Sequence, residues 1–404
     1  MRRRVFIAML ALFCGGAAHA QSSARLLVQT KAGVSATELH ALFGAHGLSR
    51  VQRIRRIRLH VLAAAPARLA EIEAVLHADP RIAFVERDRA IAPAMRPTDP
   101  VFSQQYHLAR IDCLAAWDIT IGSATAPIAI LDSGVDATHP DLVGKLVLGF
   151  NLYDHSSDTH DVSGHGTMVA GIAAAASNNG IGVSGVAWAN PIMPIRVTDE
   201  DGLAYLSTIA SGLVWAADHG ARVANLSFAV FGAQSINVAA QYFAAKGGVT
   251  FAAAGNDGFT HDDAANPWVI SVAATDQSDR IATFSSSGAY VDLAAPGVMI
   301  ATTAMGGGYA TVSGTSFASP VAAGVAALVR SVNPSLTSTQ VTDLLKANAV
   351  DVGDAGYDSH AGWGRVDALN AVAAARALVP PQDSVRTKSR RLRQRHTTLS
   401  DGEL

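Results

Sequence analysis

Gly314-Thr315-Ser316-Phe317-Ala318-Ser319-Pro320 is followed by the apolar run 321–329, and together they predict a turn that leads directly into a buried helix. Gly314 permits a tight backbone approach, and Ala, Val and Leu recur with a helical period after Pro320. Ser316 would then lie at the helix N-terminus, where unpaired N–H groups and the helix dipole favour negative charge. Taken alone, such a serine is most often only a helix cap.

Working outward, apolar segments with strand and helix character alternate from residue 97 to residue 378. The predicted strands are 128–131, 192–197, 222–228, 249–254, 268–273 and 291–294. The predicted helices are 167–176, 204–219, 236–246, 317–332, 338–347 and 366–377. Near-continuous apolar strands with intervening helices indicate an α/β domain, whose mostly parallel sheet has helices on both faces.

Two polar residues lie where a site is expected, at the carboxyl ends of predicted strands. Asp132 follows the strand 128–131, and Asn256 follows the strand 249–254 after one glycine. His165 begins a further helix between two glycines. Nucleophilic catalysis needs a hydroxyl, an imidazole that takes its proton and a carboxylate that orients the imidazole. Asp132, His165 and Ser316 supply these groups in one of the known chain orders.

The two ends of the chain have compositions of their own. Residues 1–20 combine three arginines, a short apolar run and small residues before a cleavage point, as a secretory signal peptide does. We therefore expect a secreted or periplasmic protein with no stable membrane anchor. Cys113 would be the only thiol left after cleavage, which excludes an intrachain disulfide. Residues 379–404 are polar and basic, and we expect them to form a disordered tail.

Residues 24–95 form a separate module, whose pattern predicts a ferredoxin-like β-α-β-β-α-β order. Ser35 and Glu38 are spaced as a capping box at its first helix. Residues 21–96 carry a net charge of +6, whereas residues 97–379 carry −14. Opposite charges favour docking of the module on the acidic body. The alternatives are a merely solvated face or a nucleic-acid partner, and we expect no nucleic acid because no aromatic residues interleave with the arginines.

Three motifs resemble the active-site motifs of the subtilisin-like serine proteases, and the body is most similar to the thermitase-like branch. They are Asp132-Ser133-Gly134, Gly164-His165-Gly166-Thr167 and the stretch 314–320. The resemblance covers residues 24–378, because the first module resembles the family's inhibitory propeptide, most strongly at 77–86. It implies a catalytic domain over 97–378 with an Asp132/His165/Ser316 triad.

The resemblance also implies how the substrate is held. Asn256 matches the residue whose amide stabilises the tetrahedral oxyanion together with the Ser316 N–H. A Gly-Asn pair is otherwise usually a turn. The residues implied to contact the substrate, which would bind as an added β-strand, are Ser227, Phe228, Ala254 and Gly255.

A structural calcium ion is a further implication of the resemblance. The matching positions are Asp99, Asp141 and Asn179, with the backbone carbonyls of Ile181 and Val183. Hard oxygen ligands of this kind suit Ca²⁺. The alternative is that these residues only stabilise turns.

The sequence departs from the family pattern at three places. Met168 and Val321 replace histidines that are common in the family, and the change of both to apolar residues suggests linked repacking. Asp262-Asp263-Ala264 takes the place of the element at the floor of the pocket for the residue before the cleaved bond. A carboxylate from Asp262 or Asp263 would favour Lys or Arg there, unless both side chains face solvent.

These observations predict a secreted, monomeric serine endopeptidase that cleaves proteins or peptides. It would be made as a zymogen that its own propeptide inhibits, and that cuts itself within about 92–98. One alternative is a catalytically inactive subtilisin-fold binding protein. A hydrolase of small esters on an α/β-hydrolase scaffold would need a Gly-x-Ser-x-Gly elbow and the order Ser…Asp…His, and the sequence has neither.

Overall fold

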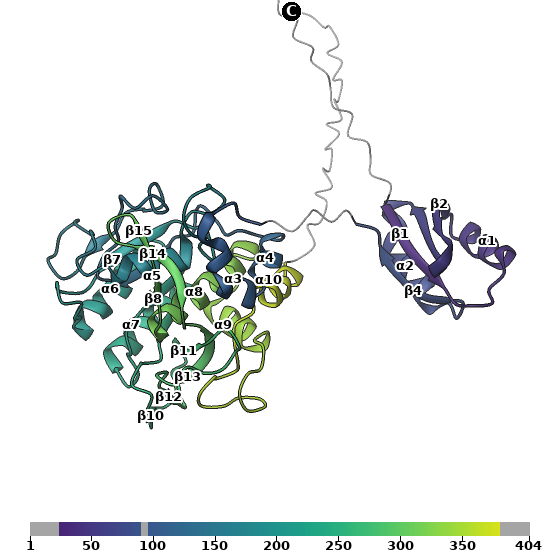
Figure 1. Cartoon of the computed structure of the whole chain (residues 1–404). Helices are drawn as coiled ribbons and strands as arrows, with labels where there is room; N and C mark the ends of the chain where they lie inside the picture. Colours follow the sequence, from purple (N-terminus) through teal and green to yellow (C-terminus); the bar gives the residue numbers. More distant parts are fainter. Residues whose placement is uncertain (1–23, 90–95, 380–404) are drawn as a thin grey trace, which may run out of the picture. The chain divides into compact units, whose positions relative to one another are not determined.

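The computed structural model describes residues 24–89 and 96–379, and these form two compact units that divide between Pro93 and Ala94 (Figure 1). The proposed signal peptide (1–20) and almost all of the proposed tail (380–404) lie outside the described residues. So does most of the segment proposed for self-cleavage.

The first unit has the predicted order of elements. Its strands and helices are β1 (Ala24–Thr30), α1 (Ala36–Ala45), β2 (Ser49–Ile54), β3 (Leu59–Ala64), α2 (Leu69–Ala78) and β4 (Ile82–Arg87). The strands form an antiparallel sheet in the order β2-β3-β1-β4. The predicted capping box at α1 is present, because Glu38 N–H donates to Ser35 Oγ and Ser35 N–H donates to Glu38 Oε2.

The second unit is built around a seven-stranded sheet in which all neighbouring strands are parallel. Its strands are β5 (Ile128–Asp132), β6 (Phe150–Asn151), β7 (Ile192–Arg196), β8 (Val223–Leu226), β9 (Val249–Ala253), β11 (Val269–Thr275) and β13 (Val291–Pro296). The strand order is β13-β11-β9-β8-β5-β7-β6. The predicted α/β class with a parallel sheet is therefore confirmed.

Helices cover both faces of this sheet. Successive side chains of each strand point to opposite faces, so one strand contributes side chains to two core clusters. Ile128 and Ile130 of β5 belong to one core cluster, and Ala129 and Leu131 belong to another. The first cluster includes α5 (His165–Ala174), α8 (Thr315–Val332), α9 (Ser338–Ala347) and α10 (Ala368–Ala377). The second includes α6 (Leu206–Asp218) and α7 (Gln234–Ala245).

Helix α8 runs through the middle of the larger core cluster. By length and composition it is the one helix in residues 24–89 and 96–379 that could cross a membrane. However, 83% of this 18-residue helix is buried inside the protein. Burial on nearly all sides explains why its sequence has an apolar residue at almost every position.

Two details differ from the sequence prediction. Helices α5 and α8 begin two residues earlier than predicted, so His165 and Ser316 lie within their first turns. The first turns were not predicted because the prediction relied on the spacing of apolar residues, and Gly, His, Thr and Ser in these turns are not part of that pattern. The hairpin of β14 (Ile300–Ala304) and β15 (Gly308–Val312) was not predicted, because its alanines and Gly308 are residues that strands disfavour.

Candidate active site

Asp132 is the last residue of β5, and its side chain is almost fully buried at 1% exposure. From β5 the chain builds β6 and β7 on one side of the strand, and then returns to place β8 on its other side. Ligand sites of parallel sheets form outside the carboxyl ends of the strands at such a reversal. The topology therefore places Asp132 where a site is expected.

His165, the first residue of α5, is bound to this carboxylate. The distance from His165 Nδ1 to Asp132 Oδ1 is 2.8 Å, and Ser133 N–H also donates to Asp132 Oδ1 at 2.8 Å. Because a carboxylate only accepts, Nδ1 carries the proton and Nε2 is left to accept one. Burial on its own would lower the pKa of His165, but the charge and hydrogen bond of Asp132 outweigh it, and the pKa is raised.

Ser316 is joined to Ser227 by two reciprocal hydrogen bonds. Ser316 Oγ donates to the Ser227 carbonyl at 3.2 Å, and Ser227 Oγ donates to the Ser316 carbonyl at 2.9 Å. Within the described residues, no hydrogen bond joins Ser316 Oγ to His165. The two are nevertheless neighbours, because Ser227 lines the same cavity as His165. The ring of Phe317, the next residue, is also 5.4 Å from the His165 ring.

The bond to the Ser316 carbonyl follows from Pro320. Within a helix this carbonyl would accept from the N–H of residue 320, which a proline lacks. Ser227 Oγ takes the place of that donor. Ser227 Oγ in turn accepts from Asn225 Nδ2 at 2.9 Å, and Ser319 Oγ donates to Asn225 Oδ1 at 2.7 Å. This chain of bonds fixes the first turn of α8 against the end of β8.

Asn256 lies on the other side of the same turn. Its Oδ1 accepts from both the N–H and the hydroxyl of Thr315, each at 2.9 Å. Gly255 N–H donates to the same hydroxyl at 3.2 Å, and the Ala254 carbonyl accepts from Tyr290 at 2.7 Å. The Nδ2 donor of Asn256 lies close to Gly314, two residues before Ser316.

A cavity of about 310 Å³ lies beside His165. It is lined by Asp132, Ser133, Ser163, His165, Asp201, Gly202, Ser227 and Phe228. Four of these residues were predicted from the sequence. Ser133, Ser163, Asp201 and Gly202 were not, although Ser133 and Ser163 lie within three residues of a predicted catalytic side chain.

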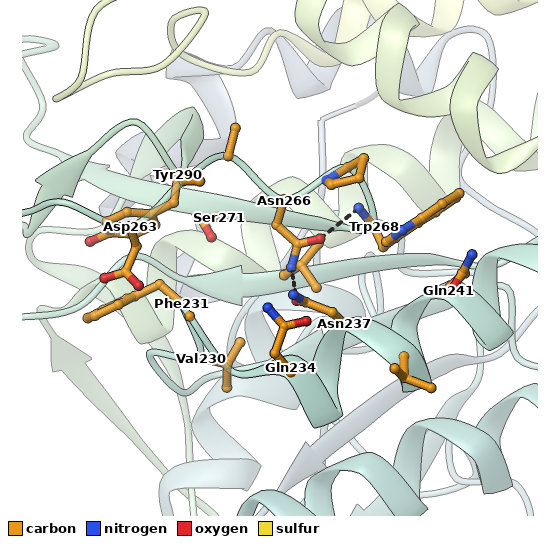
Figure 2. Close-up of a pocket in the computed structure, with 16 residues that line it drawn as sticks. Val230, Phe231, Gln234, Asn237, Gln241, Asp263, Asn266, Trp268, Ser271 and Tyr290 are labelled. Carbon is orange, nitrogen blue, oxygen red and sulfur yellow. Dashed lines mark hydrogen bonds between the residues drawn. The ribbon is translucent and has the colours of Figure 1, made fainter.

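Asp262 and Asp263 do not line this cavity. Asp263 borders a separate cavity of about 510 Å³ between α7 and the segment 263–269, while Asp262 is exposed. Figure 2 shows Asp263 beside Phe231 and Tyr290, at the end of the cavity away from Trp268. Asp263 is thus partly buried, and neither carboxylate lines the cavity beside His165.

The positions implied for calcium converge around the loop 178–183. Asp99 accepts from the N–H groups of residues 178–180 and from Ser184 Oγ. Asp141 accepts from Asn179 Nδ2 and from Val183 N–H. Asp99 and Asp141 are buried, and in the part of the chain that is described no Lys, Arg or His pairs with them.

This donor set fits a hard cation. Two uncompensated buried carboxylates make a site that a divalent cation would stabilise. The other implied oxygens, from the Asn179 amide and the Ile181 and Val183 carbonyls, lie in the same loop. No cluster of three His, Cys, Asp or Glu side chains occurs among the described residues.

Comparison with known proteins identifies the class. Residues 124–364 match the Subtilase family. The thermophilic serine proteinase of Bacillus sp. strain AK1 is 37% identical over 86% of both chains. Thermitase of Thermoactinomyces vulgaris is 41% identical over 68% of this chain and 99% of its own. A solved protease structure from Pseudoalteromonas arctica is similar with a TM-score of 0.62, at 29% identity over 70% of this chain and all of that one.

The chain therefore belongs to the subtilase family of serine proteases, and it is an enzyme that hydrolyses peptide bonds. Its relatives include thermitase and the thermophilic serine proteinase, which agrees with the predicted thermitase-like branch.

Proposed function

We propose that the chain is a secreted serine endopeptidase in which Ser316 is the nucleophile, His165 the general base and Asp132 the residue that orients the imidazole. The observation that carries the proposal is the buried 2.8 Å bond between Asp132 Oδ1 and His165 Nδ1. This bond leaves Nε2 free on the side of the cavity that Ser227 also lines. In the resting enzyme the Ser316 hydroxyl is held by the Ser227 carbonyl.

Catalysis begins when the Ser316 hydroxyl turns from Ser227 toward His165. Nε2 takes the proton as Oγ bonds to the peptide carbonyl carbon, and Asp132 stabilises the imidazolium. The C–N bond then breaks and the leaving amine takes the proton from Nε2. Water hydrolyses the acyl-enzyme by the same route, which restores the Ser316 hydroxyl.

The oxyanion would be bound by Asn256 Nδ2 and the Ser316 N–H. Two observations support this role: Thr315, the residue before Ser316, holds Asn256 Oδ1 through two hydrogen bonds, and Asn256 Nδ2 lies close to Gly314. The substrate backbone would extend along Ser227 and Phe228 on one side and along Ala254 and Gly255 on the other.

We also propose that the enzyme is exported as a zymogen, with residues 24–95 as its inhibitory propeptide and Ca²⁺ at the loop 178–183. The relatives support export, since one is named an extracellular serine protease. We expect a monomer. A preference for Lys or Arg before the cleaved bond would rest on Asp263 rather than on Asp262, because only Asp263 borders a cavity.

Active-site labelling tests the proposal. The mature protein should react with a fluorophosphonate at Ser316 and should digest casein, whereas Ser316→Ala should do neither. A Ser316→Ala chain kept from other proteases should also remain full-length. Absence of labelling and digestion in the unaltered protein would exclude the proposed mechanism, and maturation of the isolated Ser316→Ala chain would exclude self-processing.

A further inference from the structure

Asp161, four residues before His165, forms a second buried carboxylate next to the proposed triad. Its side chain is 3% exposed and accepts five hydrogen bonds. Oδ1 accepts from Ser133 Oγ at 2.7 Å, from Ser163 N–H at 3.1 Å and from Gly164 N–H at 2.8 Å. Oδ2 accepts from the N–H of Thr167 at 2.8 Å and from its hydroxyl at 2.5 Å.

These donors come from the two segments that carry Asp132 and His165. Ser133 follows Asp132 directly, and its hydroxyl also accepts from Gly166 N–H at 2.9 Å. Gly164 and Thr167 bracket His165 in the first turn of α5. Asp161 thus satisfies N–H groups that the helix leaves unpaired at its N-terminus, and it binds the same turn to the end of β5 through Ser133.

We propose that Asp161 is a positioning residue, which holds His165 in bonding register with Asp132 by tying the start of α5 to Ser133. The inference rests on the proposed function of His165 and Asp132. The Asp132 carboxylate is itself held through Oδ1 alone, because its Oδ2 is buried without a hydrogen-bond partner among the described residues. Small displacements of catalytic groups are costly: a misplacement of about 1 Å can lower the rate roughly 100-fold.

The charge of Asp161 adds a second effect at His165. Burial lowers the pKa of the imidazole, and the charges of Asp132 and Asp161 raise it. The other charged group that lines the same cavity is Asp201. Replacement of Asp161 by a neutral residue should therefore lower the pKa of His165, so that the enzyme stays active at lower pH.

Asp161→Asn tests the inference. Asparagine has the same shape as aspartate, but its side-chain NH2 group is itself a donor and would face N–H or O–H groups that now donate to the carboxylate. We expect kcat to fall about 10- to 100-fold, with KM within about twofold, since a positioning defect acts on the transition state. The acid limb of kcat/KM should move to lower pH. Asp158→Asn is the matched control: Asp158 is exposed, and in the described part of the chain its side chain accepts only from His160. It should leave kcat and KM within about twofold of the starting enzyme.

Two results would overturn the inference: a kcat for Asp161→Asn equal to that of Asp158→Asn, or a lower melting temperature with an unchanged kcat and pH profile. If Asp161→Asn does not fold, Ser133→Ala gives the decision, because it removes the link while leaving the carboxylate in place. A Ser133→Ala enzyme with undiminished kcat would contradict the proposal, and a reduced kcat at unchanged KM would support it. An unaltered enzyme without hydrolytic activity would instead refute the proposed function itself.

Discussion

Ser227→Ala should damage the enzyme through the backbone of Ser316 rather than through substrate contacts. Among the described residues, the hydroxyl of Ser227 is the one hydrogen-bond partner of the Ser316 carbonyl, which Pro320 leaves without a helical donor. The substitution leaves two groups unpaired: that carbonyl, which is partly buried, and Asn225 Nδ2, which is buried. An unsatisfied buried polar group costs about 1–3 kcal/mol. Two such groups should together lower the free energy of unfolding by about 2–6 kcal/mol.

The catalytic effect follows from the same bonds. If about 1.4–2.8 kcal/mol of this loss falls on the transition state, kcat falls about 10- to 100-fold. KM should change little, because the backbone of Ser227, which is proposed to bind the substrate, is unchanged. Ser227→Thr restores the hydroxyl and should recover most of the lost kcat.

The assay combines kinetics on a soluble peptide, normalised to active sites titrated with a fluorophosphonate, with thermal unfolding of the inhibited enzyme. Ser235→Ala makes the same chemical change on the exposed side of α7, and we expect it to be nearly neutral. The reasoning would be refuted if Ser227→Ala matched Ser235→Ala in both kcat and unfolding free energy.

Three further predictions concern other parts of the site and the core. Asn256→Ala should lower kcat about 100- to 1000-fold at nearly constant KM; steady-state kinetics showing less than a threefold change would argue against the oxyanion role. EDTA should lower the melting temperature of the mature enzyme, and Asp141→Asn should remove that sensitivity to chelator, which calorimetry with and without Ca²⁺ can measure. Burial lowers the pKa of His107 to about 3, so the unfolded chain binds a proton that the folded chain does not, and stability is lost as pH falls below about 6.5. His107→Leu should reduce the loss of unfolding free energy at pH 4.5 by about 2–3 kcal/mol. If urea titrations of the unaltered protein and of His107→Leu showed the same dependence of stability on pH, the prediction would be wrong.

The parallel sheet could be predicted because its strands are buried on both faces and therefore apolar at almost every position. Strands β5 and β9 have no exposed residue. The polar residues at their carboxyl ends could be predicted for the same reason, since an acid or amide within two positions of such an apolar run is easily distinguished from it. Asp132 and Asn256 both stood out in this way.

The residues that support the site gave no comparable signal. In the sequence, nothing distinguishes Asn225 and Ser319 as supports of the site, because that function depends on a hydrogen bond between two residues 94 positions apart. Asp161 lies in a polar loop where Asp is common, and only the folded chain shows its five donors. Hydrogen-bond partners distant in sequence leave no periodic pattern, so sequence reasoning finds the reacting groups more readily than the groups that hold them.

The electric field at His165 depends on which groups bind the two buried carboxylates of the site. Asp132 and Asp161 are buried, and within the described residues neither pairs with a Lys or Arg. In this part of the chain, only N–H and O–H groups and the His165 ring bind them, at both oxygens of Asp161 and at Oδ1 of Asp132. A cation would neutralise these charges permanently, whereas neutral donors leave their field acting on His165. In the proposed mechanism, the imidazolium that forms when Ser316 gives up its proton is then the first positive charge within this cluster. The attraction is greatest when that charge is present, so it stabilises the transition state more than the resting enzyme.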